Sequence, residues 1–232
     1  FARANILHFK KEYLESAKYL KKANNLKLYF KLSNSGILIN KSKLLSAESD
    51  TIKTNKEKYT QSLESVFIVG MPRSGSTLLE SIISMNKAVK ALGEVNFLEE
   101  SFLESKKNNQ ELTFAELYWM KVNDNMCKFN ITTNKYLYNY QYVGIILQQI
   151  PNAKIIHCFR NPLDNILSIY RAHFALEHEY SSSLIDCTEV YLDQEEVMTK
   201  YKNRFRSKIY DLNYDSLVSN PKKEIKSLIS WL

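Results

Sequence analysis

The sequence predicts an α/β fold, a parallel β-sheet flanked by helices, with a small helical extension at the N-terminus. Residues 65–70 and 154–159 are short, continuous runs of β-forming apolar residues, which is typical of strands buried on both faces of a sheet. Each run is followed by a segment whose apolar residues recur at helical spacing. Strands that alternate with helices in this way indicate a parallel sheet joined by right-handed crossovers.

The composition indicates one folded domain with an anionic partner. The chain has 232 residues and 44% apolar side chains, enough to close one sizeable hydrophobic core. Its net charge of +7 comes from scattered lysines, which suits a nucleotide or another anionic ligand but does not indicate a nucleic-acid-binding stripe. We therefore expect no nucleic-acid partner.

The cysteines and the hydropathy bear on the cellular compartment. Cys127, Cys158 and Cys187 are far apart and odd in number, which indicates a reduced compartment and predicts a cytoplasmic location. No apolar run reaches the roughly 18 residues of a membrane span, and no signal-peptide pattern is present. The chain starts at Phe1 without an initiator Met, so an upstream targeting or anchoring segment stays an open alternative.

The N-terminal part predicts helices and a linker. Residues 1–32 carry Ala17, Leu20 and Ala23 on one helical face and lysines on the other. Residues 33–65 are rich in Ser, Asn, Lys and Thr, which predicts a loop or linker with one more helix inside it. We place a domain boundary here, with a helical extension at 1–60 and the main domain at 61–232.

The main domain is predicted element by element from its periodicity. The expected strands are 65–70, 154–159 and 208–212, and the expected helices are 77–85, 110–128, 138–150, 161–174 and 220–232. Asn220 and Pro221 suit the start of the last helix, whose apolar stripe is Ile225, Leu228, Ile229 and Leu232. This helix stops without a cap, so we expect the domain to be truncated at its C-terminus.

The segment from Gly70 to Thr77 has the pattern of a phosphate-binding loop, G-x-x-x-x-G-x-[ST]. Because it follows a buried strand and opens a helix, its N–H groups would face an anion, and the sheet is P-loop-like. Ser76 stands where nucleoside triphosphatases have lysine, and Arg73 is the cation of the loop. The next strand ends at Arg160 rather than at a carboxylate for Mg²⁺, so an ordinary nucleoside triphosphatase is disfavoured. A tight strand-to-helix turn without a ligand is the alternative.

A second anion site is predicted after strand 154–159. Arg160 lies at the carboxyl end of the strand, and Asn161, Pro162 and Asp164 fit the N-cap, first and third positions of a helix. Asp164, Ser168 and Arg171 share one helical face, whereas Leu163, Ile166, Leu167 and Tyr170 supply the apolar side. Arg160 and Ser168 would then close on one phosphate. The alternative is an arginine paired with a carboxylate and a serine merely exposed on a helix.

With these segments in view, the chain resembles the sulfotransferases that use 3′-phosphoadenosine 5′-phosphosulfate (PAPS). Among them it is most similar to bacterial sulfotransferases with tetratricopeptide repeats and more distantly to tyrosylprotein sulfotransferases. The resemblance covers roughly residues 65–232. The segments that carry it are VFIVGMPRSGSTLLE (66–80), LGE (92–94), NK (134–135), PNAKIIHCFRNPLDNILSIY (151–170) and YDSLV (214–218).

The resemblance implies roles for individual residues. Arg73, Ser74, Gly75, Ser76 and Thr77 would hold the 5′-phosphosulfate, Arg160 and Ser168 the 3′-phosphate, and Tyr214 would lie near the nucleotide. Glu94 would be the catalytic base and Lys135 would assist the sulfuryl group and the leaving phosphate, with Asn139 as a further contact. The family usually has Thr at the position of Ser76. Its C-terminal segment, which often adds a basic contact to the 3′-phosphate, is absent.

The predicted reaction is therefore sulfuryl transfer from PAPS to an acceptor hydroxyl. Glu94 would accept the hydroxyl proton, and Arg73 and Lys135 would stabilise charge on the oxygens. The arrangement requires no metal; His157 is expected to be a buried, hydrogen-bonded ring, and His8, His173 and His178 have no metal-ligand spacing. Without the order of the motifs, Glu94 would be interpreted as an exposed carboxylate after a loop glycine.

Two rival functions and the choice of acceptor stay open. The first rival is a degenerate P-loop kinase or nucleoside triphosphatase, and the second is a noncatalytic protein-binding module. The first 30 residues resemble the last unit of a tetratricopeptide array, with Tyr13, Ala17 and Ala23 as cues, which suggests a protein partner. Residues 95–134 and 172–200 are predicted to be loops that select a carbohydrate, peptidyl tyrosine, lipid or small alcohol.

Overall fold

A five-stranded, fully parallel β-sheet forms the centre of the computed structural model, which describes residues 1–52, 64–107, 111–123, 131–174 and 178–232. The strand order is β2 (Val89–Ala91), β3 (Ile131–Asn134), β1 (Glu64–Gly70), β4 (Ala153–Phe159) and β5 (Ile209–Asn213). The three predicted strands are confirmed as β1, β4 and β5. The short edge strand β2 and its neighbour β3 were not predicted, since runs of three and four residues carry little periodicity.

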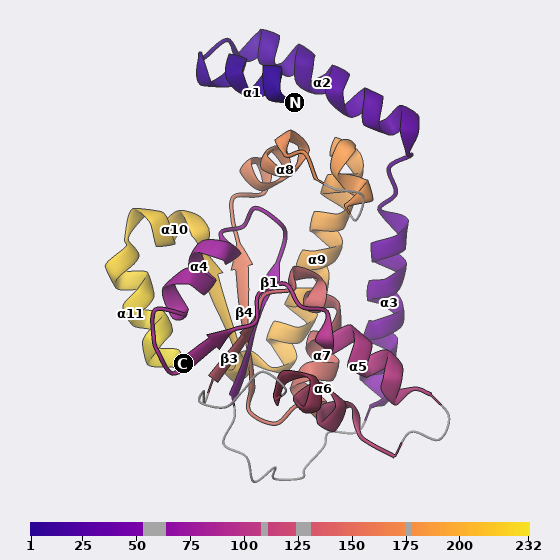
Figure 1. Ribbon diagram of the computed structural model, residues 1–232, viewed down its shortest axis with the longest axis vertical. Helices are drawn as coiled ribbons and strands as arrows, with labels where there is room; N and C mark the ends of the chain where they lie inside the picture. The colour runs from indigo at the N-terminus through magenta and orange to yellow at the C-terminus, as the bar shows by residue number, and fades with distance from the viewer. Residues whose placement is uncertain (53–63, 108–110, 124–130, 175–177) are drawn as a thin grey trace.

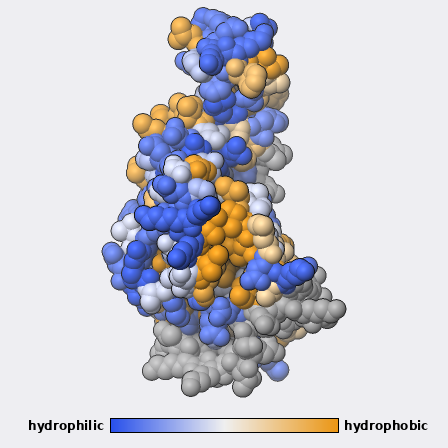
Figure 2. Space-filling view, turned by 90° about the vertical axis from the view of Figure 1, so that its left-hand side faces the viewer, coloured by the Kyte–Doolittle hydropathy of each residue, from blue (hydrophilic) through white to orange (hydrophobic). Residues whose placement is uncertain are grey.

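Helices cover both faces of this sheet (Figure 1). One face carries α4 (Ser76–Ile83), α10 (Tyr214–Ser219) and α11 (Pro221–Trp231), and apolar side chains also reach the surface on that side of the molecule (Figure 2). The other face packs against α3 (Gly36–Thr51), α5 (Phe97–Ser105), α6 (Phe114–Asn123), α7 (Val143–Gln149) and α9 (Leu184–Arg204). Side chains of β1 alternate between the two layers: Val66 and Ile68 join the first core, and Phe67 and Val69 join the second.

Most predicted helices of the main domain are present with shifted ends. The helix expected at 138–150 is a 3₁₀ turn (Leu137–Tyr142) that continues into α7. Only 114–123 of the helix expected at 110–128 is described as helical, and residues 110 and 124–128 lie outside the described part of the chain. The helix after Asn161 is α8 (Pro162–Arg171), which ends three residues before Phe174.

The prediction that residues 95–134 and 172–200 are loops is wrong. The first range contains α5, α6 and β3, and the second contains most of α9, a helix of 21 residues. The buried positions of α9 recur at helical spacing: Cys187, Val190, Tyr191, Gln194, Val197, Met198 and Tyr201. The stripe is hard to recognise in sequence because acidic residues separate its members and the polar Gln194 belongs to it.

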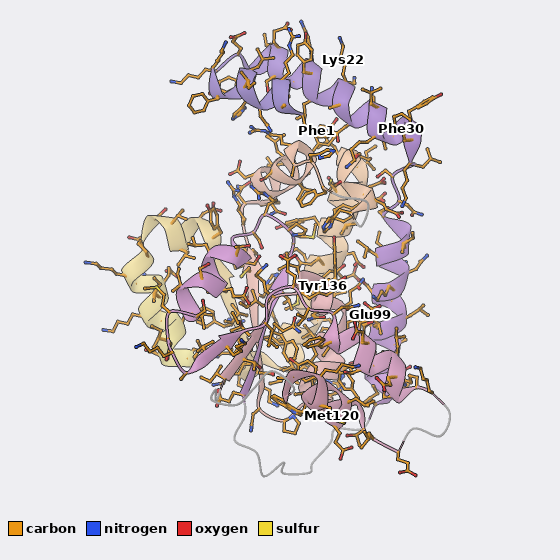
Figure 3. All side chains as sticks on the ribbon, viewed as in Figure 1. Phe1, Lys22, Phe30, Glu99, Met120 and Tyr136 are labelled. Carbon is orange, nitrogen blue, oxygen red and sulfur yellow. The ribbon has the colours of Figure 1, made fainter. Side chains whose placement is uncertain are left out.

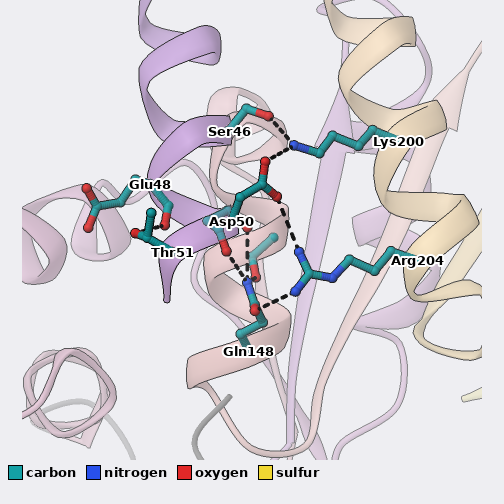
Figure 4. A network of polar contacts seen from close by, with 9 residues as sticks. Ser46, Glu48, Asp50, Thr51, Gln148, Lys200 and Arg204 are labelled. Atoms are coloured by element: carbon teal, nitrogen blue, oxygen red, sulfur yellow. Dashed lines mark hydrogen bonds and ion pairs between the residues drawn. The ribbon is translucent and has the colours of Figure 1, made fainter. Parts of the chain in front are cut away.

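A polar junction fastens α3 to α7 and α9 (Figure 4). Lys200 donates to Ser46 Oγ at 2.7 Å and to Asp50 Oδ2 at 2.8 Å. Arg204 bridges Asp50 and Gln148 Oε1, at 3.4 and 2.9 Å. The helix expected between residues 33 and 65 is thus confirmed as α3, and Leu45 of this helix joins the main core. A domain boundary near residue 60 stays a prediction.

The N-terminal residues form a helical hairpin rather than one helix. α1 (Ala2–Phe9) and α2 (Tyr13–Phe30) are joined by a turn in which Lys11 has a φ of +64°. The hairpin lies across α8, at the end of the molecule opposite the C-terminus (Figure 1). In the part of the chain that the structure describes, no helix is long and apolar enough to cross a bilayer.

Candidate functional site

The carboxyl edge of the sheet carries the candidate site. The loop of residues 71–75 follows β1, and Arg160 follows β4. In the sheet, β1 lies between β4 on one side and β3 on the other. The chain therefore leaves β1 and β4 at the point where the strand order reverses. Open α/β sheets bind ligands in the crevice at such a point.

The phosphate loop has the backbone conformation that its glycines allow. Gly70 has a φ of +140°, and a Cβ there would lie 2.2 Å from the carbonyl oxygen of Cys158. Gly75 has a φ of +89° and lies directly against the Tyr214 ring. The next residue begins α4, whose first N–H groups have no acceptor within the helix and no side-chain cap. The loop thus presents free donors to an anion.

The loop after β4 is fixed by side-chain hydrogen bonds. Asn161 Oδ1 accepts from the N–H groups of Leu163 and Asp164, at 3.0 and 3.3 Å, which confirms Asn161 as the N-cap of α8. Asn165, fully buried on α8, donates from Nδ2 to the carbonyl of Pro72 at 2.9 Å. This contact ties α8 to the phosphate loop. The contact was not predicted from the sequence, although a polar residue on the buried side of a helix requires a partner.

Three cavities meet at Arg73. The first, of about 350 Å³, is lined by Arg73, Arg160, Ser168 and Arg171 among others. The second, of about 210 Å³, lies over the phosphate loop between Arg160 and Tyr214. The third, of about 180 Å³, runs from Thr77 to Glu94. One arginine therefore connects the two predicted anion sites with the predicted catalytic carboxylate.

Contacts among these residues link the anion sites. Arg73 Nε donates to Ser168 Oγ at 3.2 Å. The Arg160 guanidinium lies 5.0 Å from the centre of the Tyr214 ring and has Asp215 Oδ1 at 3.7 Å from its Nε. This separation is too long for a hydrogen bond, and Nε is buried without a hydrogen-bond partner among the described residues. Arg160 therefore has donors left for a ligand.

Glu94 and Lys135 form an ion pair at the same edge of the sheet. The Lys135 side chain is 6% exposed, whereas that of Glu94 is 67% exposed. The Lys135 N–H donates to the carbonyl of Gly93 at 2.8 Å, which extends the pairing of β2 and β3 beyond their last residues. Lys135 is thus a buried cation behind a carboxylate that faces the third cavity.

Aromatic side chains line the rest of the third cavity. Tyr136, Tyr138, Phe174 and His178 face Thr77 and Glu94 across it. The Tyr138 hydroxyl lies 2.6 Å from His178 Nδ1 and 3.1 Å from the Tyr180 hydroxyl. This lining was not predicted from the sequence, since its members come from separate segments that only the fold brings together.

The other predicted site residues lie in or directly behind this region. Ser76, Thr77 and Tyr214 line the cavities. Ser74 is buried, with no hydrogen-bond partner for its Oγ among the described residues. Asn139 is fully buried and donates to Asn134 Oδ1 at 3.1 Å, so it supports the Asn134–Lys135 segment and does not reach a cavity.

His157 is a buried ring, as predicted. It lies within β4, with its Nε2 2.8 Å from Gln194 Nε2 and its Nδ1 3.3 Å from Asp211 Oδ1. Because the amide donates to Nε2, the ring donates from Nδ1 to the carboxylate. The ring thereby joins β4 to β5 and α9.

The comparisons with known proteins agree with one another. A sequence profile described as "Sulfotransferase family" matches residues 65–126 and 107–232. An uncharacterized protein of Aquifex aeolicus is 30% identical over 192 residues; the match covers 72% of this chain and 25% of that protein. The chain thus spans about a quarter of the length of the curated relative that it matches.

Solved structures share the fold. The sulfotransferase domain of the curacin biosynthetic pathway is 18% identical over 73% of each chain, with a TM-score of 0.56. The sulfotransferase domain of the Synechococcus PCC 7002 olefin synthase is 18% identical over 78% of this chain and 76% of that one, with a TM-score of 0.53. A sulfotransferase from Alicyclobacillus acidocaldarius is 16% identical over 72% of this chain and 80% of that one, with a TM-score of 0.51.

Proposed function

Because this chain belongs to the sulfotransferase family, we propose that it transfers a sulfuryl group from PAPS to an acceptor hydroxyl. The observation that carries the proposal is the meeting of two cationic cavities at Arg73, next to the Glu94 carboxylate. PAPS has two anionic groups, the 3′-phosphate and the 5′-phosphosulfate. The donors of these cavities suit a ligand of that kind.

The first and second cavities suit different anionic groups of PAPS. We assign the 5′-phosphosulfate to the N–H groups at the start of α4, the hydroxyls of Ser74, Ser76 and Thr77, and Arg73. We assign the 3′-phosphate to Arg160 and Ser168. Tyr214 packs against Gly75 and Arg160, so its ring holds the phosphate loop and the second arginine in place.

The proposed transfer needs one proton acceptor and two cations. The acceptor oxygen attacks sulfur, its proton passes to a Glu94 carboxylate oxygen, and the bond between sulfur and the 5′-phosphate oxygen breaks. The leaving group is 3′-phosphoadenosine 5′-phosphate. Arg73 and Lys135 stabilise negative charge on the sulfuryl and leaving oxygens, and positioning supplies much of the remaining acceleration. The donors present suffice for this chemistry without a metal ion.

The third cavity is the proposed acceptor site. Its lining by Tyr136, Tyr138, Phe174 and His178 supports an acceptor with a flat face, such as a sugar ring or a phenol, over a lipid. Carbohydrates, peptidyl tyrosine and small alcohols are the classes to screen. Two of the three cysteines, Cys158 and Cys187, are buried and free, which supports the proposed cytoplasmic location. Closeness to the tetratricopeptide-repeat or tyrosylprotein members stays a prediction.

Ligand-induced stabilisation tests the proposal. A ligand that binds only the folded state raises the melting temperature. We expect a rise with 3′-phosphoadenosine 5′-phosphate, little or none with ATP and Mg²⁺, and loss of the rise in Arg160→Ala. Arg206→Ala, which changes an exposed arginine outside the three cavities, is the control. A rise only with ATP and Mg²⁺ would favour the kinase alternative, and no rise with either ligand would favour a noncatalytic module.

A further inference from the structure

One wall of the first cavity comes from outside the main domain. Asn5 of α1 lines this cavity together with Arg73, Arg160 and Ser168. Its side chain carries an amide, which donates two hydrogen bonds and accepts others. The N-terminal hairpin thus contributes a polar group to the cavity assigned above to the 3′-phosphate.

Specific polar contacts hold the hairpin in this position. Asn24 of α2 is 1% exposed, and its Nδ2 donates to the carbonyl of Tyr170 at 3.1 Å. Lys27 donates to the carbonyl of Phe174 at 3.2 Å, and Lys31 forms an ion pair with Glu179. Phe1 lies between the hairpin and α8 and contacts the His173 ring, with 5.1 Å between ring centres (Figure 3). The bond of the buried Asn24 side chain fixes the register of the hairpin on α8, because a shift would leave a buried amide unpaired.

The hairpin also holds a third arginine at the cavity. Arg171 lies one turn beyond Ser168 on the same face of α8, and both line the cavity. Arg171 Nη1 lies 3.0 Å from His8 Nε2 of α1. A guanidinium can only donate, so the His8 nitrogen accepts. This bond uses one of the five N–H groups of Arg171, which leaves donors for a ligand.

The charge of the cavity favours a multiply charged anion. Three guanidiniums, those of Arg73, Arg160 and Arg171, line it with one carboxylate, that of Asp164. Like charges confined in one cavity repel, and an anion bound among them relieves the repulsion. A phosphate monoester dianion has the charge and the acceptor oxygens to engage all three arginines and the Asn5 amide.

We propose that the N-terminal hairpin completes the nucleotide site, with Asn5 and Arg171 binding the 3′-phosphate and His8 positioning Arg171. This inference rests on the function proposed above. It explains why a helical extension lies across α8 instead of projecting away from the domain. It also assigns a nucleotide-binding role to the first ten residues, whose sequence pattern indicates only an amphipathic helix.

Calorimetric affinities for two nucleotides test the proposal on the full chain. The probes are 3′-phosphoadenosine 5′-phosphate and adenosine 5′-phosphate, which lacks the 3′-phosphate. We expect Arg171→Ala to weaken binding of the first about 10-fold or more and Asn5→Ala to weaken it about 3- to 10-fold, because each removes a hydrogen bond to a charged group. Binding of adenosine 5′-phosphate should change less than 2-fold.

Two substitutions on the same hairpin serve as controls. Arg3, which stacks on Tyr19, and Asn25 are exposed and do not line the cavity. Arg3→Ala and Asn25→Ala should leave both affinities unchanged. Equal losses for both nucleotides in Asn5→Ala and Arg171→Ala would overturn the assignment to the 3′-phosphate.

The positioning role of His8 requires a double-mutant cycle. His8→Ala should weaken binding of 3′-phosphoadenosine 5′-phosphate in the wild-type chain but not in Arg171→Ala, since His8 acts through Arg171. Equal effects of His8→Ala in both chains would contradict this role. If wild type binds no 3′-phosphoadenosine 5′-phosphate, the proposed function fails together with the inference. If wild type binds it and the Asn5 and Arg171 variants bind as tightly, only the inference fails.

Discussion

At the scale of single residues, Arg73 is central to the site. It is a non-glycine residue with a φ of +68°, a conformation that costs about 1 kcal/mol or more. The strain is maintained by the buried loop around it, in which Pro72 is held by Asn165. This conformation places the Arg73 guanidinium where all three cavities meet. The same side chain lies next to both proposed anion sites and to the cavity that contains Glu94.

Glu94→Gln tests the proposed base. The amide cannot accept the hydroxyl proton, so we expect kcat to fall by about 10²- to 10⁴-fold while affinity for 3′-phosphoadenosine 5′-phosphate is kept. Turnover with an identified acceptor is the measurement. Glu48→Gln is the matched control, because Glu48 also pairs with a lysine, Lys106, but lines none of the three cavities. Full turnover in a folded Glu94→Gln protein would remove Glu94 from the mechanism.

Gly75→Ala tests the close packing of the phosphate loop. Both Gly75 and Gly93 have positive φ, but a Cβ at Gly75 would lie 2.2 Å from the Tyr214 ring, whereas a Cβ at Gly93 meets nothing within 4 Å. We expect Gly93→Ala to lower the free energy of unfolding by about 1 kcal/mol through backbone strain alone, and Gly75→Ala by about 2–4 kcal/mol. Urea unfolding measures both, and equal losses would show that Tyr214 moves freely.

At the scale of elements, the junction of α3, α7 and α9 supports the face of the sheet that carries the main core. The three helices approach closely at Gly144, where a Cβ would lie 2.1 Å from Ser49 Oγ and 2.4 Å from the Tyr201 ring. Around this contact, Gln148 Nε2 donates to the carbonyl of Ser49 at 2.9 Å. α3 therefore packs closely against the helices that cover this face of the sheet.

Gly144→Ala tests that close approach. Its methyl group would force α7 away from α3 and α9, and we expect a loss of about 1–3 kcal/mol in the free energy of unfolding. Gly36→Ala, at the first position of α3, has only its own turn nearby, since Asn34 Oδ1 lies 3.1 Å from the added Cβ. It should change stability by less than about 0.5 kcal/mol. Thermal and urea unfolding compare the two, and a neutral Gly144→Ala would contradict the tight junction.

At the scale of the whole molecule, Asp211 ties the edge strand β5 to β4 and to α9. Partial burial favours the protonated form, but hydrogen bonds from His157, Lys202 and Arg206 outweigh it and hold the pKa of Asp211 below its usual range. These partners come from β4, from α9 and from the turn before β5. One carboxylate thus links three neighbouring elements.

The depressed pKa of Asp211 predicts a dependence of stability on pH. Its contribution is fully present above the pKa of the unfolded chain, about 4, and is lost as the pH falls through the lower folded-state pKa. Asp211→Asn should therefore cost about 1–2 kcal/mol at pH 7 and progressively less below pH 4. Urea unfolding of both proteins at pH 7 and pH 3 measures this. A difference that does not shrink at pH 3 would contradict the role of the ionised carboxylate.

Local sequence patterns were enough to predict the elements whose residues are neighbours in the chain. The strand-loop-helix units at 65–83 and 154–171 are local patterns, because a buried strand, a glycine turn and an N-cap depend on neighbours. They were sufficient to predict the α/β fold and to propose two anion sites, whereas Glu94 was singled out only by the family resemblance, because strand β2 before it was not predicted. The helical pattern of α9 was also present and was misjudged because charged residues interrupt it.

The residues that share a cavity could be identified only from the folded structure. Arg73 and Ser168 are 95 positions apart, and Asn5 and Arg171 lie farther apart still, yet all four line one cavity. The strand order placed β1 beside β4, and the packing of the hairpin on α8 brought α1 to the same edge. Such proximity depends on how distant segments pack against one another. A local stretch of sequence carries no information about that packing.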